Sequence, residues 1–264
     1  MRSVVICEGL DDVKFLTYYL MYKCSWEHLK PNKVARKKFY GRNGQYLIAD
    51  KDSDEQFYKK GEDMLLVCKS NGKTKFNFLY ENLVDTVDIV NDFKLDNLFI
   101  LTDNDDNDVE GILNEISRSF EELNVELSDL QNMEISKTSS FNLVPVIVPE
   151  EHMGAIESVA LERVENLNVD TKYVVKYADK YVDCVRKNLV LGLYLTHRRE
   201  ILKSKFMSVM SIINPTARFD KFSEVLASTV YYDSEIVDSC FSIIDKFASE
   251  CKSDIKCVKS MNLV

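Results

Sequence analysis

Three acidic residues follow two apolar segments of the sequence, at the point where each segment ends. Glu8 comes directly after the run 3–7, which is short, apolar and rich in β-branched residues, and Asp103 and Asp105 follow a similar run at 97–102. Such runs are typical of strands buried on both faces of a parallel sheet. In these sheets ligands bind at the carboxyl ends of the strands. If the two strands are neighbours, the three carboxylates therefore converge on one site.

The chemistry of these residues indicates a hard divalent cation. Carboxylates held close together repel one another unless a cation neutralises them. Oxygen ligands without Cys or His favour Mg²⁺, or Mn²⁺, over zinc. The chain has 3 His residues, and none of its 7 cysteines forms a C-x-x-C pair. We therefore predict a magnesium or manganese site made by Glu8, Asp103 and Asp105, with two ions about 3.5–4 Å apart as one arrangement.

The Asp-rich segment 103–108 has two other interpretations. A run of Asp and Asn after a strand is often a solvated loop, in which Asp108 caps the next helix. An EF-hand loop is the second interpretation. It fails because its sixth position is Asp108 instead of Gly and its twelfth is Asn114 instead of Glu.

The first part of the chain alternates predicted strands and helices, which indicates an α/β fold with a Rossmann-like, open and mostly parallel sheet. Asp11 or Asp12 is expected to cap the helix after Gly9. Besides the two strands above, strands are predicted at 64–68 and 143–148, and helices at 76–90, 109–120 and 156–164. Beyond residue 170 only helices are expected, at 173–190, 199–213 and 234–247. We predict an α/β domain at 1–168 and a helical region at 169–264, which can pack on the same domain.

The order of these motifs resembles the Toprim (topoisomerase–primase) domain. An apolar strand, Glu8-Gly9-x-x-Asp12 and a helix are followed far downstream by another apolar strand and Asp103-x-Asp105. The resemblance implies a Rossmann-like sheet in which Glu8 works in catalysis and the D-x-D pair binds Mg²⁺. Asp12 is expected to contribute to the metal site from the first helix.

Later segments resemble stand-alone Toprim proteins related to the OLD-family (overcoming lysogenization defect) nucleases. The segment 149–157 and a downstream basic helix carry this resemblance. It implies that a further acidic residue and a lysine join the site. Glu157 and Lys205 match these positions, and Glu150 and Lys203 are their rivals. The resemblance also implies hydrolysis of DNA or RNA, as an effector of phage defence partnered with an ABC-type ATPase.

The formal net charge of −9 is not that of a typical nucleic-acid-binding protein. Binding would need local basic clusters, and the sequence has two. Basic groups interleaved with aromatic residues suit a surface that follows phosphates. A solvated loop and a solvated helix face are the alternative interpretations. The predicted nucleic-acid-binding residues are Lys33, Arg36, Lys37, Lys38 and Arg42 in the first cluster, and Arg198, Arg199 and Lys203 in the second.

Two rival functions remain open at this point. A receiver-like signalling module also places acidic residues after its first and third strands, and Asp11, Asp12 and Asp103 imitate that pattern. A Toprim-fold binding protein without catalytic activity is the other rival. The sequence has no G-x-x-x-x-G-K-[ST] motif, so any use of ATP is expected from a partner.

The location and assembly of the protein are predicted from general features. The first apolar run breaks at Glu8, so no signal peptide is expected. No apolar stretch approaches the length of a membrane helix. Scattered cysteines are typical of reduced thiols in the cytoplasm. The apolar faces of the C-terminal helices can pack on the sheet or on a second copy of the chain, which leaves a homo-oligomer open.

Overall fold

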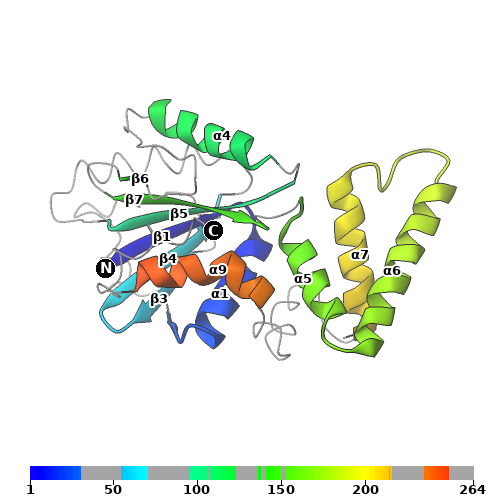
Figure 1. The fold of residues 1–264 in the computed structure, drawn as a ribbon, viewed down its shortest axis with the longest axis horizontal. Helices are drawn as coiled ribbons and strands as arrows, with labels where there is room; N and C mark the ends of the chain where they lie inside the picture. Colours follow the sequence, from blue (N-terminus) through cyan, green and yellow to red (C-terminus); the bar gives the residue numbers. More distant parts are fainter. Residues whose placement is uncertain are drawn as a thin grey trace, which may run out of the picture.

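The chain forms a mixed seven-stranded sheet with helices on both sides (Figure 1), within the part that the structure describes. This structure is a computed structural model. It confirms the α/β fold and the Rossmann-like, mostly parallel sheet. It describes residues 1–30, 55–70, 95–105, 108–122, 136–137, 141–149, 153–213, 215 and 235–249.

Four parallel strands form the centre of the sheet. In spatial order they are β4 (Asp63–Lys69), β1 (Arg2–Cys7), β5 (Asn97–Asp103) and β7 (Asn142–Val148). All four correspond to strands predicted from apolar runs, because helices cover both faces and nearly every side chain is buried. β1 and β5 are direct neighbours, with Cys7 paired to Leu101. The carboxyl ends of these two strands therefore lie side by side, as the candidate site requires.

Three shorter antiparallel strands extend the sheet at its edges. β3 (Gln56–Lys60) pairs with β4, β2 (Glu27–Leu29) pairs with β3, and β6 (Ser136–Lys137) pairs with β7. None of them was predicted. In β3 the consecutive residues Phe57 and Tyr58 are both buried, so the strand shows no apolar alternation that would mark it.

Two helices far apart in the sequence cover the same side of the sheet. α1 (Leu10–Tyr22) and α9 (Glu235–Ala248) contact each other, and α9 also packs on β4, β5 and β7. The rings of Tyr19 and Phe241 lie 5.4 Å apart between them. α4 (Val109–Glu122) lies on the opposite side (Figure 1). The last described helix thus belongs to the core around the sheet.

Three further helices pack together beside the sheet (Figure 1). They are α5 (Ile156–Glu165), α6 (Val169–Asn188) and α7 (Arg198–Ile213). α6 begins earlier than predicted, because Asn168 caps it by accepting a hydrogen bond from the backbone N–H of Thr171 at 3.0 Å. The predicted helix at 76–90 lies outside the described residues. None of the described helices is long and apolar enough to cross a membrane.

Candidate metal centre

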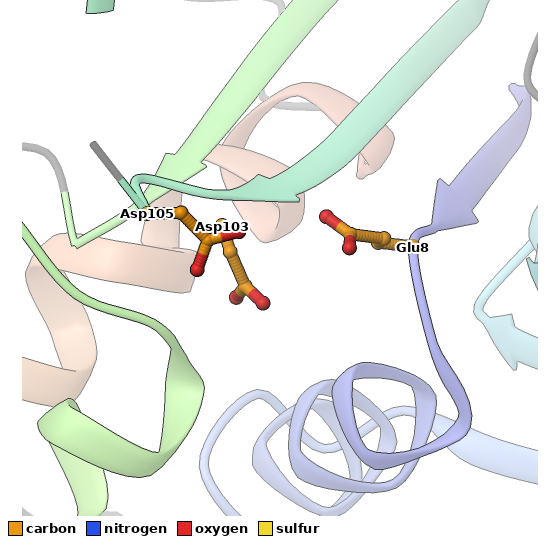
Figure 2. Close-up of side chains that lie close together, drawn as sticks. All are labelled: Glu8, Asp103 and Asp105. Carbon is orange, nitrogen blue, oxygen red and sulfur yellow. The ribbon is translucent and has the colours of Figure 1, made fainter. Parts of the chain in front are cut away.

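Glu8, Asp103 and Asp105 come together at the carboxyl edge of the sheet. One oxygen atom from each carboxylate can be chosen so that all three lie within 4.8 Å of one another. Figure 2 shows Glu8 entering this space from the end of β1 and the two aspartates entering it from the end of β5. Glu8 and Asp103 are buried, and Asp105 is half-buried. These three carboxylates can hold a metal ion.

The pairing of β1 with β5 positions the first two carboxylates. The backbone N–H of Glu8 donates to the carbonyl of Leu101 at 3.1 Å, which continues the ladder one residue past β1. Glu8 is then opposite Thr102, whose hydroxyl donates to Oε2 of Glu8 at 3.2 Å. Asp103 ends β5, and its Oδ1 accepts from the backbone N–H of Ile156 at 3.3 Å. That N–H belongs to the first turn of α5, where helices favour negative charge.

Two more carboxylates surround this group. Asp12 is buried, and its Oδ2 accepts a hydrogen bond from the backbone N–H of Gly9 at 2.7 Å. Gly9 is the N-cap of α1, so Asp12 caps that N–H from inside the helix instead of being the N-cap itself. Glu157 is buried in the first turn of α5. Both were predicted metal ligands, and they lie near enough to influence the charge of the site without belonging to the close group of three.

The electrostatics of the site favour a bound cation. Burial, followed by the charges of Asp12, Glu8 and Glu157, raises the pKa of Asp103 from 3.8 to about 9, although Arg199 opposes this. Burial also raises the pKa of Asp12 to about 7, against the lowering effect of its hydrogen bond from Gly9. Crowded carboxylates with little access to water resist ionisation. A divalent cation would relieve both the repulsion and the loss of solvation.

Two arginines at the start of α7 contact the residues of the site. Nη1 of Arg199 lies 2.9 Å from Oε1 of Glu8, and Nη2 lies 3.4 Å from Oδ2 of Asp103. Burial lowers the pKa of Arg199, but the hydrogen bond to Glu8 and the nearby carboxylates raise it more, so its guanidinium is charged. Arg198 instead donates to backbone carbonyls, those of Asp105 and Met153. The side chain of Arg199, which was predicted to bind nucleic acid, thus lies among the predicted metal ligands.

The two candidate lysines of α7 have different surroundings. Nζ of Lys203 lies 3.4 Å from Oε1 of Glu157, beside the acidic group. Lys205, the predicted catalytic lysine, forms an ion pair with Asp179 of α6 instead. The structure therefore places Lys205 in the contact between two helices and its rival Lys203 at the site. Two positions along a helix turn the side chain by about 200°, so the lysines face different sides of α7, and only the packing decides which side borders the site.

Other predicted residues are only partly covered by the structure. Asp108 caps α4 through a 2.7 Å hydrogen bond from the backbone N–H of Gly111, as the loop interpretation expected. The acidic rival Glu150 lies outside the described residues, and so does the first basic cluster, made of Lys33, Arg36, Lys37, Lys38 and Arg42.

Sequence reasoning missed two features of the site. Thr102 was assigned to its strand only, although its hydroxyl holds Glu8. Its position directly before the D-x-D pair was the available signal. The contact of Arg199 with Glu8 joins residues 191 positions apart, and no local pattern in the sequence could have shown it.

Comparisons with known proteins bear on the fold alone. No family model matches the chain, and no curated protein matches it. The crystal structure of a hypothetical protein from Pyrococcus horikoshii OT3 is similar, with a TM-score of 0.51 and 14% identity over 94% of this chain and 100% of that one. This likeness supports the α/β architecture. The cytosolic domain of L. pneumophila FeoB aligns over 94% of this chain and 95% of that one, with a TM-score of 0.24 and 10% identity. That likeness is too weak to bear on the fold.

Proposed function

We propose that the protein is a Mg²⁺- or Mn²⁺-dependent nuclease that uses a Toprim-like acidic site to hydrolyse phosphodiester bonds. The observation that carries the proposal is the convergence of Glu8, Asp103 and Asp105 within 4.8 Å at the carboxyl ends of two adjacent parallel strands. Their order and spacing match the Toprim signatures quoted above. The donor set consists of carboxylate oxygens only, which suits a hard divalent cation.

The side chains of the site have separable roles in this proposal. Asp103 and Asp105 would hold the cation together with Glu8. When bound, the cation would withdraw charge from the phosphodiester oxygens and favour attack at phosphorus. Glu8 would also accept a proton from the attacking water, through a carboxylate that Thr102 holds at Oε2 and Arg199 contacts at Oε1. Lys203, which lies 3.4 Å from Glu157 beside the acidic group, would stabilise negative charge that develops on the phosphate.

Asp105 favours this proposal over the receiver-like alternative. A receiver would use one aspartate after its third strand as phosphoacceptor, which leaves the second aspartate without a role. Here Asp105 lies with Glu8 and Asp103 in one group, so that both members of the D-x-D pair face the same space. Transfer of phosphate from acetyl phosphate to Asp103 would support the alternative.

The wider setting of the protein is part of the same proposal. By its likeness to stand-alone Toprim proteins, it would act in the cytoplasm as a phage-defence effector restrained by an ABC-type ATPase. A homo-oligomer is compatible with this role.

The test is cleavage of a panel of DNA and RNA substrates, single- and double-stranded, with Mg²⁺ or Mn²⁺ at low and moderate salt. The parent chain is compared with Glu8→Gln and Asp103→Asn, and with Glu110→Gln as a matched control, because Glu110 lies in the exposed first turn of α4. We expect both site variants to lose cleavage and calorimetric Mn²⁺ binding, and the control to retain both. Equal cleavage by the site variants would refute the assignment. Metal binding without cleavage by the parent would indicate control by a partner, and no metal binding would remove the site itself.

A further inference from the structure

The outward face of α6 carries a regular pattern that the proposed metal centre does not use. A Lys-Tyr pair recurs every four residues, at 172–173, 176–177 and 180–181. These side chains are exposed, and the tyrosines show 53%, 61% and 63% of their surface to solvent, in chain order. Four residues are close to one helical turn, so the pairs lie above one another, about 6 Å apart along the axis. We name these six residues the Lys–Tyr face.

The opposite side of α6 anchors the helix. Ala178 and Val182 are buried there, and Val174 and Val175 pack against the core. α6 contacts α5 and α7. Figure 1 places α6 at the edge of the molecule, farther from the sheet than α5 and α7. The helix is thus fixed through one side, while the exposure of the Lys–Tyr face shows that no described element covers it.

Two of the three rings of this face stack on each other. Tyr173 and Tyr177 stack with their centroids 6.5 Å apart and their planes at 26°. Nζ of Lys180 lies 5.4 Å from the centre of the Tyr177 ring. A solvated helix face normally carries polar and charged side chains, and rows of large rings there leave apolar surface in water. An array of flat rings and ammonium groups is suited to a ligand that offers both flat apolar groups and negative charge.

The charge of the face indicates a polyanion. α6 carries the exposed basic residues Lys172, Lys176, Lys180, Arg186 and Lys187, and three acidic ones. Of these, Asp170 is exposed, Asp183 is half-buried, and Asp179 forms an ion pair with Lys205 of α7. This local excess of positive charge stands in a chain whose net charge is −9. This face therefore complements a phosphate backbone, although the chain as a whole is acidic.

We propose that the Lys–Tyr face binds single-stranded nucleic acid, with lysines contacting phosphates and tyrosine rings stacking on bases. A single strand is favoured over a duplex because duplex bases are already stacked on each other and offer the rings no free face. If the protein is the proposed nuclease, this face makes single-stranded nucleic acid its substrate class. Only this biological role of the face rests on the proposed function. Binding itself does not need the acidic site.

The connection between α6 and α7 links this face to the metal centre. α6 ends at Asn188, and the segment 189–197 leads to α7. Arg198, its first residue, donates to the backbone carbonyl of Asp105, and Arg199 contacts the carboxylate of Glu8. The two helices pack against each other with the connecting segment at one end (Figure 1). A single strand of nucleic acid that lies along the Lys–Tyr face and continues past the C-terminal end of α6 would therefore reach the start of α7, which borders the acidic group.

Binding is tested with the full chain carrying Asp103→Asn, which keeps the oligonucleotide intact if the protein cleaves it. Fluorescence anisotropy is measured with fluorescein-labelled oligo-dT and oligo-U, and with a duplex of the same length. Adding Tyr177→Ala is expected to weaken single-strand binding about tenfold, the usual order for loss of one base–aromatic stack. Tyr22→Ala is the matched control, because Tyr22 is an equally exposed tyrosine at the end of α1. The control should bind as its parent does.

The lysines are tested through the dependence of binding on salt. Replacing Lys172, Lys176 and Lys180 by Gln should reduce the slope of log K against log salt by about 2, since each phosphate contact on a single strand contributes about 0.7. Lys246→Gln, an exposed lysine of α9, should leave the slope unchanged. Thermal unfolding of each variant checks that the fold is intact.

Three results would overturn the proposal. The first is no single-strand binding by the parent, and the second is a preference for the duplex. The third is unchanged oligonucleotide binding in the α6 variants while light scattering shows that they dissociate an oligomer, which would assign the face to a second copy of the chain. The two proposals fail separately. Cleavage that is unchanged in the α6 variants would refute only the proposed role of the Lys–Tyr face. Binding of single-stranded nucleic acid through α6, without metal binding, would refute only the proposed nuclease activity.

Discussion

Nη1 of Arg199 lies 2.9 Å from Oε1 of Glu8, although the two residues are 191 positions apart in the chain. The same guanidinium lies 3.4 Å from Oδ2 of Asp103 and 3.9 Å from Oδ2 of Asp105. Arg199 therefore contacts all three carboxylates of the candidate metal centre. A positive side chain in this position neutralises part of the charge that a divalent cation would neutralise. It both stabilises the acidic group and competes with metal for it.

Removing this competitor should strengthen metal binding. We expect Arg199→Gln to bind Mn²⁺ about fivefold to a hundredfold more tightly, because a unit charge about 4 Å from a carboxylate contributes about 1–3 kcal/mol in a partly exposed site. Isothermal calorimetry of the metal alone measures this. Arg198→Gln is the matched control, since Arg198 contacts backbone carbonyls instead of carboxylates. Weaker Mn²⁺ binding by Arg199→Gln would mean that the arginine supports the site instead of competing for it.

The raised pKa of Asp103 predicts how stability depends on pH in the presence of chelator. Its pKa rises from an ordinary 3.8 to about 9 in the folded protein, mainly because of burial. The unfolded chain therefore releases the proton of Asp103 at lower pH than the folded chain does. The contribution of Asp103 to stability is greatest below about pH 4 and is lost as the pH rises toward about 9. Asp103→Asn should remove that loss. Its unfolding temperature at about pH 8 should exceed that of the parent by several degrees, since about 2–4 °C corresponds to each kcal/mol in a chain of this size.

Thermal unfolding with EDTA at a series of pH values checks this expectation. The difference between Asp103→Asn and the parent should shrink as the pH is lowered toward about 4. Asp170→Asn is a suitable control, because Asp170 is an exposed aspartate in the first turn of α6, outside the acidic group. A difference that does not vary with pH would show that the charge of Asp103 is not the cause.

The two lysines of α7 should separate in function. Lys203→Met removes the cation beside Glu157 and should lower cleavage at least about tenfold, as loss of a group that stabilises developing charge does. Lys205→Met removes an ion pair with Asp179 at the α6–α7 contact, and should cost less than about 1 kcal/mol of stability without affecting cleavage. Rates of oligonucleotide cleavage and thermal unfolding distinguish the two. The reverse pattern would return the catalytic role to Lys205.

Asp245 should be important for the attachment of α9. Its Oδ1 accepts hydrogen bonds from Nε1 of Trp26 and from Nζ of Lys60, both at 2.7 Å. Asp245→Ala leaves the buried indole N–H without this acceptor and should destabilise the fold by about 1–3 kcal/mol. Denaturant-induced unfolding measures the change. Ser242→Ala, at an exposed position of the same helix, should have almost no effect.

The sequence alone determined the parallel centre of the sheet and the core of the candidate site. The runs before Glu8 and Asp103 are apolar because these strands are buried on both faces, and that burial is visible in the residue types themselves. The carboxylates follow the strand ends directly, so their position at the sheet edge needed only the neighbouring order of β1 and β5. Both properties are local, or follow from the general topology of parallel sheets.

Tertiary structure alone decided which distant side chains complete the site. Arg199 reaches Glu8, and Lys203 instead of Lys205 faces Glu157, because packing fixes the rotation of α7 about its axis. The same packing fixes α6 so that its tyrosines face solvent, although a helical sequence pattern does not say which neighbours cover it. The antiparallel edge strands were missed for a related reason. Their few residues are held by pairing with a neighbouring strand, and that stabilisation leaves no periodic signal in the sequence.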